Sequence, residues 1–240
     1  MNSDNGEYMA GNKIIVVTGA SDGIGKAIAR KLARGDCTLI LVSKNEEKLN
    51  DVSSEIKNSR YFICDITDNE RVKDIIAKVE KVYGRIDVLV NNAGMWIEGE
   101  LDANNPEQIR KTLETNLLGQ IYVTKAIVPL MKKQKYGIIV NIISHSAKHA
   151  KAERSVYDAT KFGFDGFTKS LQEELHRYNI RVSGIYPAKV KTNLFSKAGV
   201  DKSMDGAIEA DDVANVVEFI LSQPDSIEIP EIGIRSILYR

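Results

Sequence analysis

The segment from Lys13 to Gly25, K-I-I-V-V-T-G-A-S-D-G-I-G, limits the possible fold more than any other part of the chain. Ile14–Val17 is a short β-branched apolar run, which predicts a strand buried on both faces. A glycine-rich turn follows, and after it the apolar residues recur with a helical period. A strand, such a turn and a helix N-terminus together form a phosphate site, because free backbone amides and the helix dipole favour negative charge. A turn without a ligand is the alternative, and the strand-to-helix context favours the nucleotide.

Strand-like and helix-like segments alternate along the rest of the chain. Strands are predicted at 14–17, 38–42, 61–63, 86–90, 137–143 and 181–186, with a last one within 227–239. Helices are predicted at 24–34, 45–57, 68–83, 106–134, 154–178 and 211–222. This order predicts an α/β fold with a Rossmann-type, doubly wound parallel sheet and helices on both faces, in three layers. We expect one domain over 13–240, preceded at 1–12 by a polar, disordered leader or a remnant of expression.

Composition excludes several classes of partner. The 240 residues include 33 basic and 33 acidic ones, so net charge gives no reason to expect nucleic acid or a membrane surface. No apolar stretch approaches the length of a membrane span, and residues 1–12 lack the apolar core of a signal peptide. Cys37 and Cys64 are expected to be core thiols of a cytoplasmic protein. His145 and His149 have a metal-ligand spacing, but no third ligand is evident, so no metal is expected.

Tyr157 and Lys161 form a candidate acid–base pair. Residues four apart lie on the same face of a helix, so the ammonium should lower the pKa of the phenol from about 10. A tyrosine tuned in this way can exchange a proton with an alcohol or a carbonyl near neutral pH. On its own the spacing is weak, because many helices carry such a pair on a solvated face.

Several motifs in order make the chain resemble the short-chain dehydrogenase/reductase family. The glycine turn matches that family's T-G-x-x-x-G-x-G, and the four residues Asn91-Asn92-Ala93-Gly94 match its N-N-A-G. Asn116 lies in E-T-N-L-L-G and Ser144 in V-N-I-I-S, which match the family's asparagine and serine motifs. The segment from Pro187 to Thr192 matches P-x-x-V-x-T. The resemblance runs in register from about Lys13 to Thr192.

The resemblance implies an NAD(P)-dependent oxidoreductase that interconverts a secondary alcohol and a ketone by hydride transfer. Tyr157 would be the acid/base, and Ser144 would hydrogen-bond the reacting oxygen. Lys161 would lower the pKa of the tyrosine and hold the nicotinamide ribose. Asn116 would hold a water that links Lys161 to solvent. Each residue also has an ordinary structural interpretation, and the set in register favours the catalytic one.

The resemblance also implies where the cofactor binds. The expected cofactor-binding residues are Gly19, Ser21, Asp22, Gly23, Ile24, Gly25, Ser43, Lys44, Asp65, Ile66, Asn92, Ala93, Gly94, Tyr157, Lys161, Pro187, Val190 and Thr192. The second strand ends at Ser43, followed by Lys44, where an acidic residue would exclude a 2′-phosphate. This favours NADP(H) over NAD(H). Asp22 stands where NADP-preferring relatives often have a basic residue, which weakens that preference.

The substrate is not identifiable from the sequence. Ser146, Trp96, Tyr186, Lys189 and Phe195 are expected to contact it, on proximity to the motifs, and the polar segment 191–211 is expected to form a modest lid. A small carbonyl or alcohol is the expected partner. A nucleotide-binding regulator without turnover is the main alternative, and a Rossmann enzyme of other chemistry, such as a methyltransferase, is a third.

Helices 106–134 and 154–178 carry more apolar residues than one sheet face needs. This excess predicts a homodimer or homotetramer by analogy with relatives that pair these helices. The residues concerned are Val123, Ile127, Phe164, Phe167 and Leu171.

Overall fold

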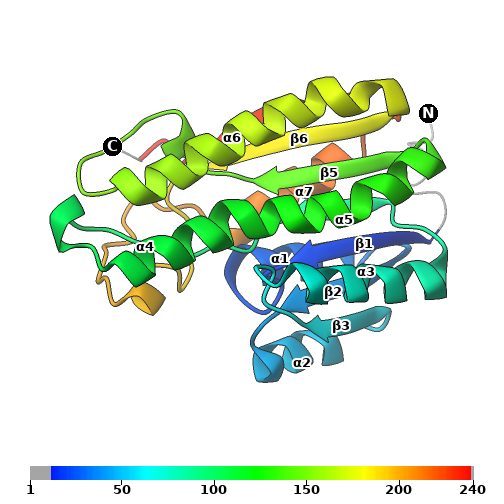
Figure 1. Ribbon diagram of the computed structural model, residues 1–240, viewed down its shortest axis with the longest axis horizontal. Coiled ribbons are helices and arrows are strands. Elements are labelled where there is room, and N and C mark those ends of the chain that lie inside the picture. The colour runs from blue at the N-terminus through cyan, green and yellow to red at the C-terminus, as the bar shows by residue number, and fades with distance from the viewer. Residues whose placement is uncertain (1–11, 239–240) are drawn as a thin grey trace, which may run out of the picture.

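Seven parallel strands lie in one sheet in the order β3-β2-β1-β4-β5-β6-β7 (Figure 1). The structure is a computed structural model that describes residues 12–238. The strands are β1 (Lys13–Thr18), β2 (Cys37–Ser43), β3 (Ser59–Ile63), β4 (Val88–Asn91), β5 (Gly137–Ile142), β6 (Ile180–Pro187) and β7 (Glu231–Ile234). Every residue of β4, β5 and β6 is buried, which explains why these strands read as continuous rather than alternating apolar runs.

Helices cover both faces of the sheet, so the predicted three-layer Rossmann-type fold is confirmed. The helices are α1 (Gly23–Leu32), α2 (Glu46–Ser54), α3 (Asn69–Tyr83), α4 (Pro106–Leu113), α5 (Gly119–Gln134), α6 (Ser155–Leu175) and α7 (Ala210–Leu221). One apolar core packs α1, α2 and α7 against the sheet, and a second packs α3, α5 and α6 against its other face. In Figure 1 the second group lies in front of the strands.

Side-chain caps begin several of these helices where the sequence changes from strand to helix. Asp22, Asn45 and Asp68 cap α1, α2 and α3, each accepting a hydrogen bond from a backbone amide of the first turn. Gly84 ends α3 in the left-handed conformation, with φ of 69°. Each cap lies just after the carboxyl end of a strand or its loop, so the caps hold these loops at one edge of the sheet.

The strand order reverses its direction between β1 and β4. The chain first winds from β1 through β2 to β3 and then crosses back to β4, which pairs with the other side of β1. A reversal of this kind separates the loops that leave neighbouring strands and opens a crevice at their carboxyl ends. In Figure 1 the arrowheads point to the left, where the segment between β6 and α7 also lies.

One sequence prediction differs from the structure, a second is confirmed, and a third lies mostly outside the described residues. The helix expected at 106–134 contains a π-helical turn, Glu114–Leu118, between α4 and α5. The last strand, expected within 227–239, is present as Glu231–Ile234 and pairs with the end of β6. The leader predicted at 1–12 lies, except for Asn12, outside the described residues, and the single domain over 13–240 stays a prediction.

The apolar residues from which oligomerisation was predicted are mostly part of the core. Val123, Ile127, Phe164 and Leu171 are buried within the chain, and Phe167 is half-buried against the same core. They pack against the sheet and neighbouring helices, so their apolar character needs no second subunit. This basis for the prediction is therefore wrong, although oligomerisation itself stays a prediction.

Candidate active site

A cavity of about 650 Å³ lies at the carboxyl ends of the strands. The loops that leave β1, β2, β3, β4, β5 and β6 all contribute to its wall, and so does the segment between β6 and α7. The expected cofactor residues line it with the single exception of Gly25. Among the expected substrate residues, Ser146, Trp96, Lys189 and Phe195 line it as well. The cavity therefore joins most of the residues that the sequence motifs singled out.

The glycine turn needs its glycines for two different reasons. Gly19 has φ of 64° and Gly23 has φ of 51°, a backbone region that other residues seldom adopt. Gly25 is needed for space, because a Cβ there would lie 2.3 Å from the carbonyl oxygen of Gly19 and 2.5 Å from the side chain of Asn92. Asn92 in turn donates hydrogen bonds to the carbonyl groups of Thr18 and Gly19. Gly25 thus allows the loop to pack closely against Gly19 and Asn92, and it does not line the cavity.

Asp22 is the centre of a cluster of charges at this end of the cavity. Its carboxylate accepts hydrogen bonds from Lys48 at 3.1 Å and Lys197 at 2.9 Å, and also from the amide of Gly23. Burial acts to raise the pKa of Asp22, but Lys197 and Lys48 outweigh it and hold the pKa well below its usual range. Two cations therefore stand beside the residue that was expected to disfavour a phosphate.

The ends of β2 and β3 add further polar groups. The hydroxyls of Ser21 and Ser43 lie 2.8 Å apart, and Lys44 lies 3.7 Å from the carboxylate of Asp65. Asp65 also accepts two hydrogen bonds from Thr67. Burial acts to raise the pKa of Asp65, and these bonds together with the charge of Lys44 keep it below its usual value. Asp65 thus both lines the cavity and forms the turn ahead of α3.

Tyr157, Ser144 and Lys161 meet on the cavity wall between β5 and α6. The side chain of Ser144 acts to lower the pKa of the Tyr157 phenol, and the Lys161 ammonium lies 5.8 Å from the centre of the tyrosine ring. The ammonium also lies 3.4 Å from the carbonyl oxygen of Ile142 at the end of β5. Tyr157 and Lys161 are both buried, so these groups interact with little water between them.

The expected net lowering of the pKa of the phenol is wrong, because burial moves it upward. Burial raises the pKa of Tyr157 to about 12, and the neighbouring Asp158 adds to this rise, whereas Ser144 and Arg154 act against it. Burial also lowers the pKa of Lys161 to about 8. Desolvation is therefore the largest influence on both groups, because each charged form loses its water. At neutral pH the phenol is protonated, which is the form that can donate a proton.

Asn116 supports the site instead of lining the cavity. It lies in the π-helical turn, and its amide exchanges hydrogen bonds with both backbone groups of Met95, at 2.8 and 2.9 Å. The same amide donates to Thr160, next to Lys161 on α6. The π turn widens the helix at this point, and such turns are frequent at functional sites. Asn116 thereby ties the loop after β4 to the helix that carries the tyrosine and the lysine.

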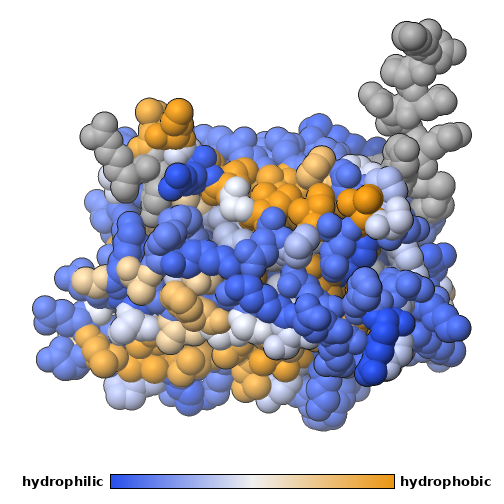
Figure 2. Space-filling model, turned by 90° about the horizontal axis from the view of Figure 1, so that it is seen from above, coloured by the Kyte–Doolittle hydropathy of each residue, from blue (hydrophilic) through white to orange (hydrophobic). Residues whose placement is uncertain are grey.

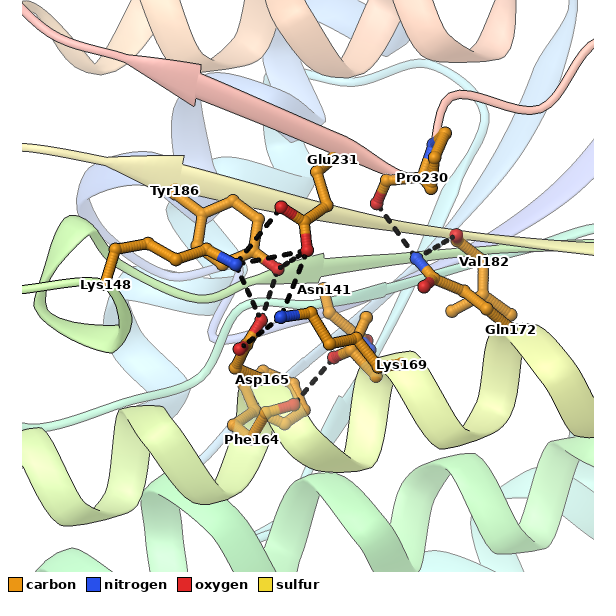
Figure 3. A network of polar contacts seen from close by, with 11 residues as sticks. Asn141, Lys148, Phe164, Asp165, Lys169, Gln172, Val182, Tyr186, Pro230 and Glu231 are labelled. Carbon is orange, nitrogen blue, oxygen red and sulfur yellow. Dashed lines mark hydrogen bonds and ion pairs between the residues drawn. The ribbon is translucent and has the colours of Figure 1, made fainter.

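Tyr186 belongs to a different cluster and is a correction to the expected substrate residues. Its hydroxyl lies 2.5 Å from the carboxylate of Asp165 and 3.3 Å from that of Glu231. Lys148 and Lys169 pair with the same two carboxylates (Figure 3). The ring is buried and is not part of the cavity wall. The cluster joins α6, β6 and β7, so Tyr186 holds the sheet edge together.

Comparison with known proteins gives a consistent result. A family model described as short chain dehydrogenase matches residues 13–203. The chain belongs to the short-chain dehydrogenase family. It is 33% identical over 226 residues to an uncharacterized oxidoreductase of Staphylococcus epidermidis, covering 94% of this chain and 97% of the relative.

Two solved structures are similar over nearly their whole length. An alcohol dehydrogenase from the archaeon Thermococcus sibiricus, complexed with 5-hydroxy-NADP, is 28% identical with a TM-score of 0.88 and coverage of 95% and 98%. A metagenomic short-chain oxidoreductase in complex with NADP is 34% identical with a TM-score of 0.83 and coverage of 97% and 100%. The chain is thus an oxidoreductase of a family that uses NAD or NADP.

The site of this short-chain dehydrogenase fits a nicotinamide dinucleotide. The positive φ angles of Gly19 and Gly23 bring backbone amides to the cavity wall at the N-terminus of α1, where a pyrophosphate is favoured. Lys44, Lys48 and Lys197 supply positive charge at the same end. Lys161 supplies a basic group 5.8 Å from the tyrosine ring at the other end.

Sequence reasoning missed several residues of the site. Lys48 lies in the first turn of α2, just after Lys44 and the N-cap Asn45, and its ion pair with Asp22 joins residues 26 apart in sequence. Lys197 and Lys202 lie in the expected lid and reach Asp22 and Glu98 on other loops. No local pattern in the sequence reveals such long-range pairs. No helix among the described residues is long and apolar enough to span a bilayer.

Proposed function

We propose that this protein is an NADP(H)-dependent oxidoreductase that interconverts a secondary alcohol and a ketone. The observation that carries the proposal is the meeting of Tyr157, Ser144 and Lys161 on one wall of a cavity that continues to the glycine turn. An acid–base group and a dinucleotide cradle within one cavity are what hydride transfer to a carbonyl requires.

The roles of the three residues follow from their environment. When bound, the nicotinamide ring supplies or accepts the hydride. Tyr157 is protonated at neutral pH and donates its proton to the carbonyl oxygen during reduction, and it takes the proton of the alcohol during oxidation. Ser144 hydrogen-bonds the same oxygen and stabilises the charge that develops on it. Lys161, as a cation, stabilises the phenolate that remains after the proton has left.

The charges at the glycine turn support NADP(H) over NAD(H). Ser43 ends β2 without a carboxylate, and Lys44, Lys48 and Lys197 surround this end of the cavity. Lysines bind phosphate as point charges, so a 2′-phosphate would find three of them within one region. The two similar structures that contain NADP or a derivative of it agree with this preference.

A homodimer or homotetramer is part of the proposal. Leu113 at the end of α4, Leu118 at the end of the π turn and Phe162 on α6 expose apolar side chains at 41%, 38% and 46%. Figure 2, which looks down on the β6–β7 edge, also shows apolar patches within a mostly hydrophilic surface. Burial of such patches favours association. Light scattering that gives the mass of a single chain would contradict it.

A cytoplasmic location is also proposed. Its support is that both cysteines are free and buried, as is usual in reducing compartments. The proposed partner is a small carbonyl or alcohol, and no nucleic acid or membrane partner is proposed.

The test is nicotinamide absorbance with purified protein, NADPH and NADH in parallel, against ketones, aldehydes and hydroxy acids. The proposal expects oxidation of NADPH with at least one carbonyl and a larger kcat/KM with NADPH than with NADH. Binding of NADPH, seen by its fluorescence, without turnover of any compound would instead favour a nucleotide-binding regulator. Absence of binding to both nucleotides would contradict both functions.

A further inference from the structure

The end of the cavity beside Tyr157, here called the substrate chamber, has an aromatic wall. The centre of the Trp96 ring lies 4.3 Å from that of Tyr157 and 4.8 Å from that of Phe195. The three side chains are almost completely buried and form one apolar cluster with Ile97 and Val156. A substrate whose carbonyl reaches Tyr157 therefore has an apolar surface against its body.

Cations stand at the edge of this aromatic wall. The Arg154 guanidinium lies 5.1 Å and the Lys202 ammonium 4.9 Å from the centre of the Trp96 ring. Lys189 and Lys151 also line the same cavity. The carboxylates that line the cavity, Asp22 and Asp65, belong to the glycine-turn end. The substrate chamber is thus positively charged although the whole chain has no net charge.

Two of these cations, Arg154 and Lys189, form no ion pair within residues 12–238. Lys202 pairs with Glu98, which also accepts a hydrogen bond from Trp96. Among the described residues, 12–238, Lys189 donates only to the backbone carbonyl groups of Ser203 and Asp205. In the same range, the Arg154 guanidinium makes neither an ion pair nor a hydrogen bond; it stacks on Trp96, and its charge acts at longer range on Glu98. Arg154 therefore retains its full set of donors for a ligand.

Arg154 also lies close enough to influence the acid–base group. It comes three residues before Tyr157 at the start of α6, and its charge acts to lower the pKa of the phenol. Nearby, burial and the charges of His149, Arg235 and Lys151 lower the pKa of His145, which lines the same cavity. Asp158, the buried acid beside Tyr157, accepts a hydrogen bond from the backbone amide of Lys151.

We propose that the substrate carries a carboxylate and that Arg154 binds it. The substrate class is then an oxo acid in reduction and a hydroxy acid in oxidation. This inference rests on the proposed function, because it assigns a substrate class to the same site. A guanidinium presents paired N–H donors that match the two oxygens of a carboxylate. A half-buried guanidinium without a partner also has more to gain from such an anion than a solvated one.

The test compares 2-, 3- and 4-oxo acids with their methyl esters, using NADPH. Each acid and its ester share the ketone and differ in charge, so the ratio of their kcat/KM values reports recognition of the carboxylate. The variants are Arg154→Met, which removes the charge, and Arg154→Lys, which keeps it. Arg177→Met is the matched control, because Arg177 is exposed and stacks on Tyr178 outside the cavity.

The expected result is an acid favoured over its ester by about tenfold or more in the unaltered protein. Arg154→Met should lower this ratio by about tenfold or more, Arg154→Lys by less, and Arg177→Met should leave it in place. Preference for the esters, or an acid-to-ester ratio that Arg154→Met does not change, would overturn the inference.

A second readout separates this inference from the proposed function. Trp96 is the only tryptophan, so its fluorescence reports binding in the chamber without turnover. If no carbonyl compound of any kind is reduced, the proposed function fails. Even then, the anion site would be supported if 4-oxopentanoate quenches the Trp96 fluorescence saturably and the quenching is weaker in Arg154→Met. Quenching that is absent, or equal in the two proteins, would overturn the inference as well.

Discussion

Lys197 and Asp22 form an ion pair of 2.9 Å that joins the segment after β6 to the N-terminus of α1. The same carboxylate holds Lys48 of α2. Three segments far apart in sequence therefore converge on one acidic side chain. In the proposed NADP(H) enzyme, Asp22 competes with the 2′-phosphate for these two lysines.

Replacing Asp22 with asparagine should strengthen the binding of NADPH. The amide can still cap α1, while the carboxylate that occupies Lys48 and Lys197 is removed. We expect the KM for NADPH to fall by about two- to fivefold at low salt, as is usual for partly exposed ion pairs. NADH, which has no 2′-phosphate, is the control. An equal fall in the KM for NADH would contradict the competition.

The charge of Lys161 should set the upper pH limit of the reaction. Burial lowers the pKa of Lys161 to about 8, so the cation is present below this pH and is lost above it. The kcat/KM for NADPH, which reports groups of the free enzyme, should therefore decline above about pH 8. Lys161→Arg keeps its charge and should move the decline to higher pH. An unchanged profile in this variant would assign the decline to another group.

Gly25→Ala should damage the glycine turn. The added Cβ would lie 2.3 Å from the backbone oxygen of Gly19, an atom that cannot move without distorting the loop. We expect a loss of about 1–3 kcal/mol in the free energy of unfolding, measured in urea, together with weaker NADPH binding. Gly166→Ala in α6 is the matched control, because nothing lies within 4 Å of its Cβ. Similar losses in both variants would contradict the steric explanation.

Tyr186→Phe should destabilise the β6–β7 edge in a pH-dependent way. Burial acts to raise the pKa of Asp165, but hydrogen bonds from Tyr186, Lys169 and Lys148 hold it below 3.8. A lowered pKa contributes stability that is complete above the unfolded value and is lost as the pH falls through the folded one. We expect a loss of about 1–3 kcal/mol at neutral pH that shrinks in acid.

Urea unfolding at neutral pH and near pH 3 measures this effect. Tyr178→Phe is the control, because within residues 12–238 the Tyr178 hydroxyl makes no hydrogen bond. A loss for Tyr186→Phe that stays the same at both pH values would contradict the coupling to Asp165.

Local sequence patterns predicted the fold and the loops of the site well. The run before Gly19 is buried on both faces as expected, and the motif residues come together because parallel strands end at the same edge. The pKa of Tyr157 could not be predicted from its spacing to Lys161, because burial by Trp96 and Phe195 decides it. Their contact depends on how the segment after β6 folds back, which no local pattern encodes.

The positions of polar and charged side chains outside the motifs were harder to predict for the same reason. Tyr186 follows the strand pattern of a cavity residue, yet its ring lies on the side of β6 that faces Asp165. Arg154 carries no motif, and its importance comes only from its place against Trp96. Side-chain direction on a strand and long-range contacts of a loop both require the three-dimensional fold.

The most direct test of the central claim is the rate of NADPH oxidation in a single turnover by Tyr157→Phe, with the best carbonyl substrate found. Phenylalanine keeps the ring against Trp96 and removes only the hydroxyl. The account predicts a rate about 10²- to 10⁴-fold below that of the unaltered protein, with NADPH still bound. A variant that oxidises NADPH at the unaltered rate would show that Tyr157 is not the acid, and the proposed mechanism would be wrong.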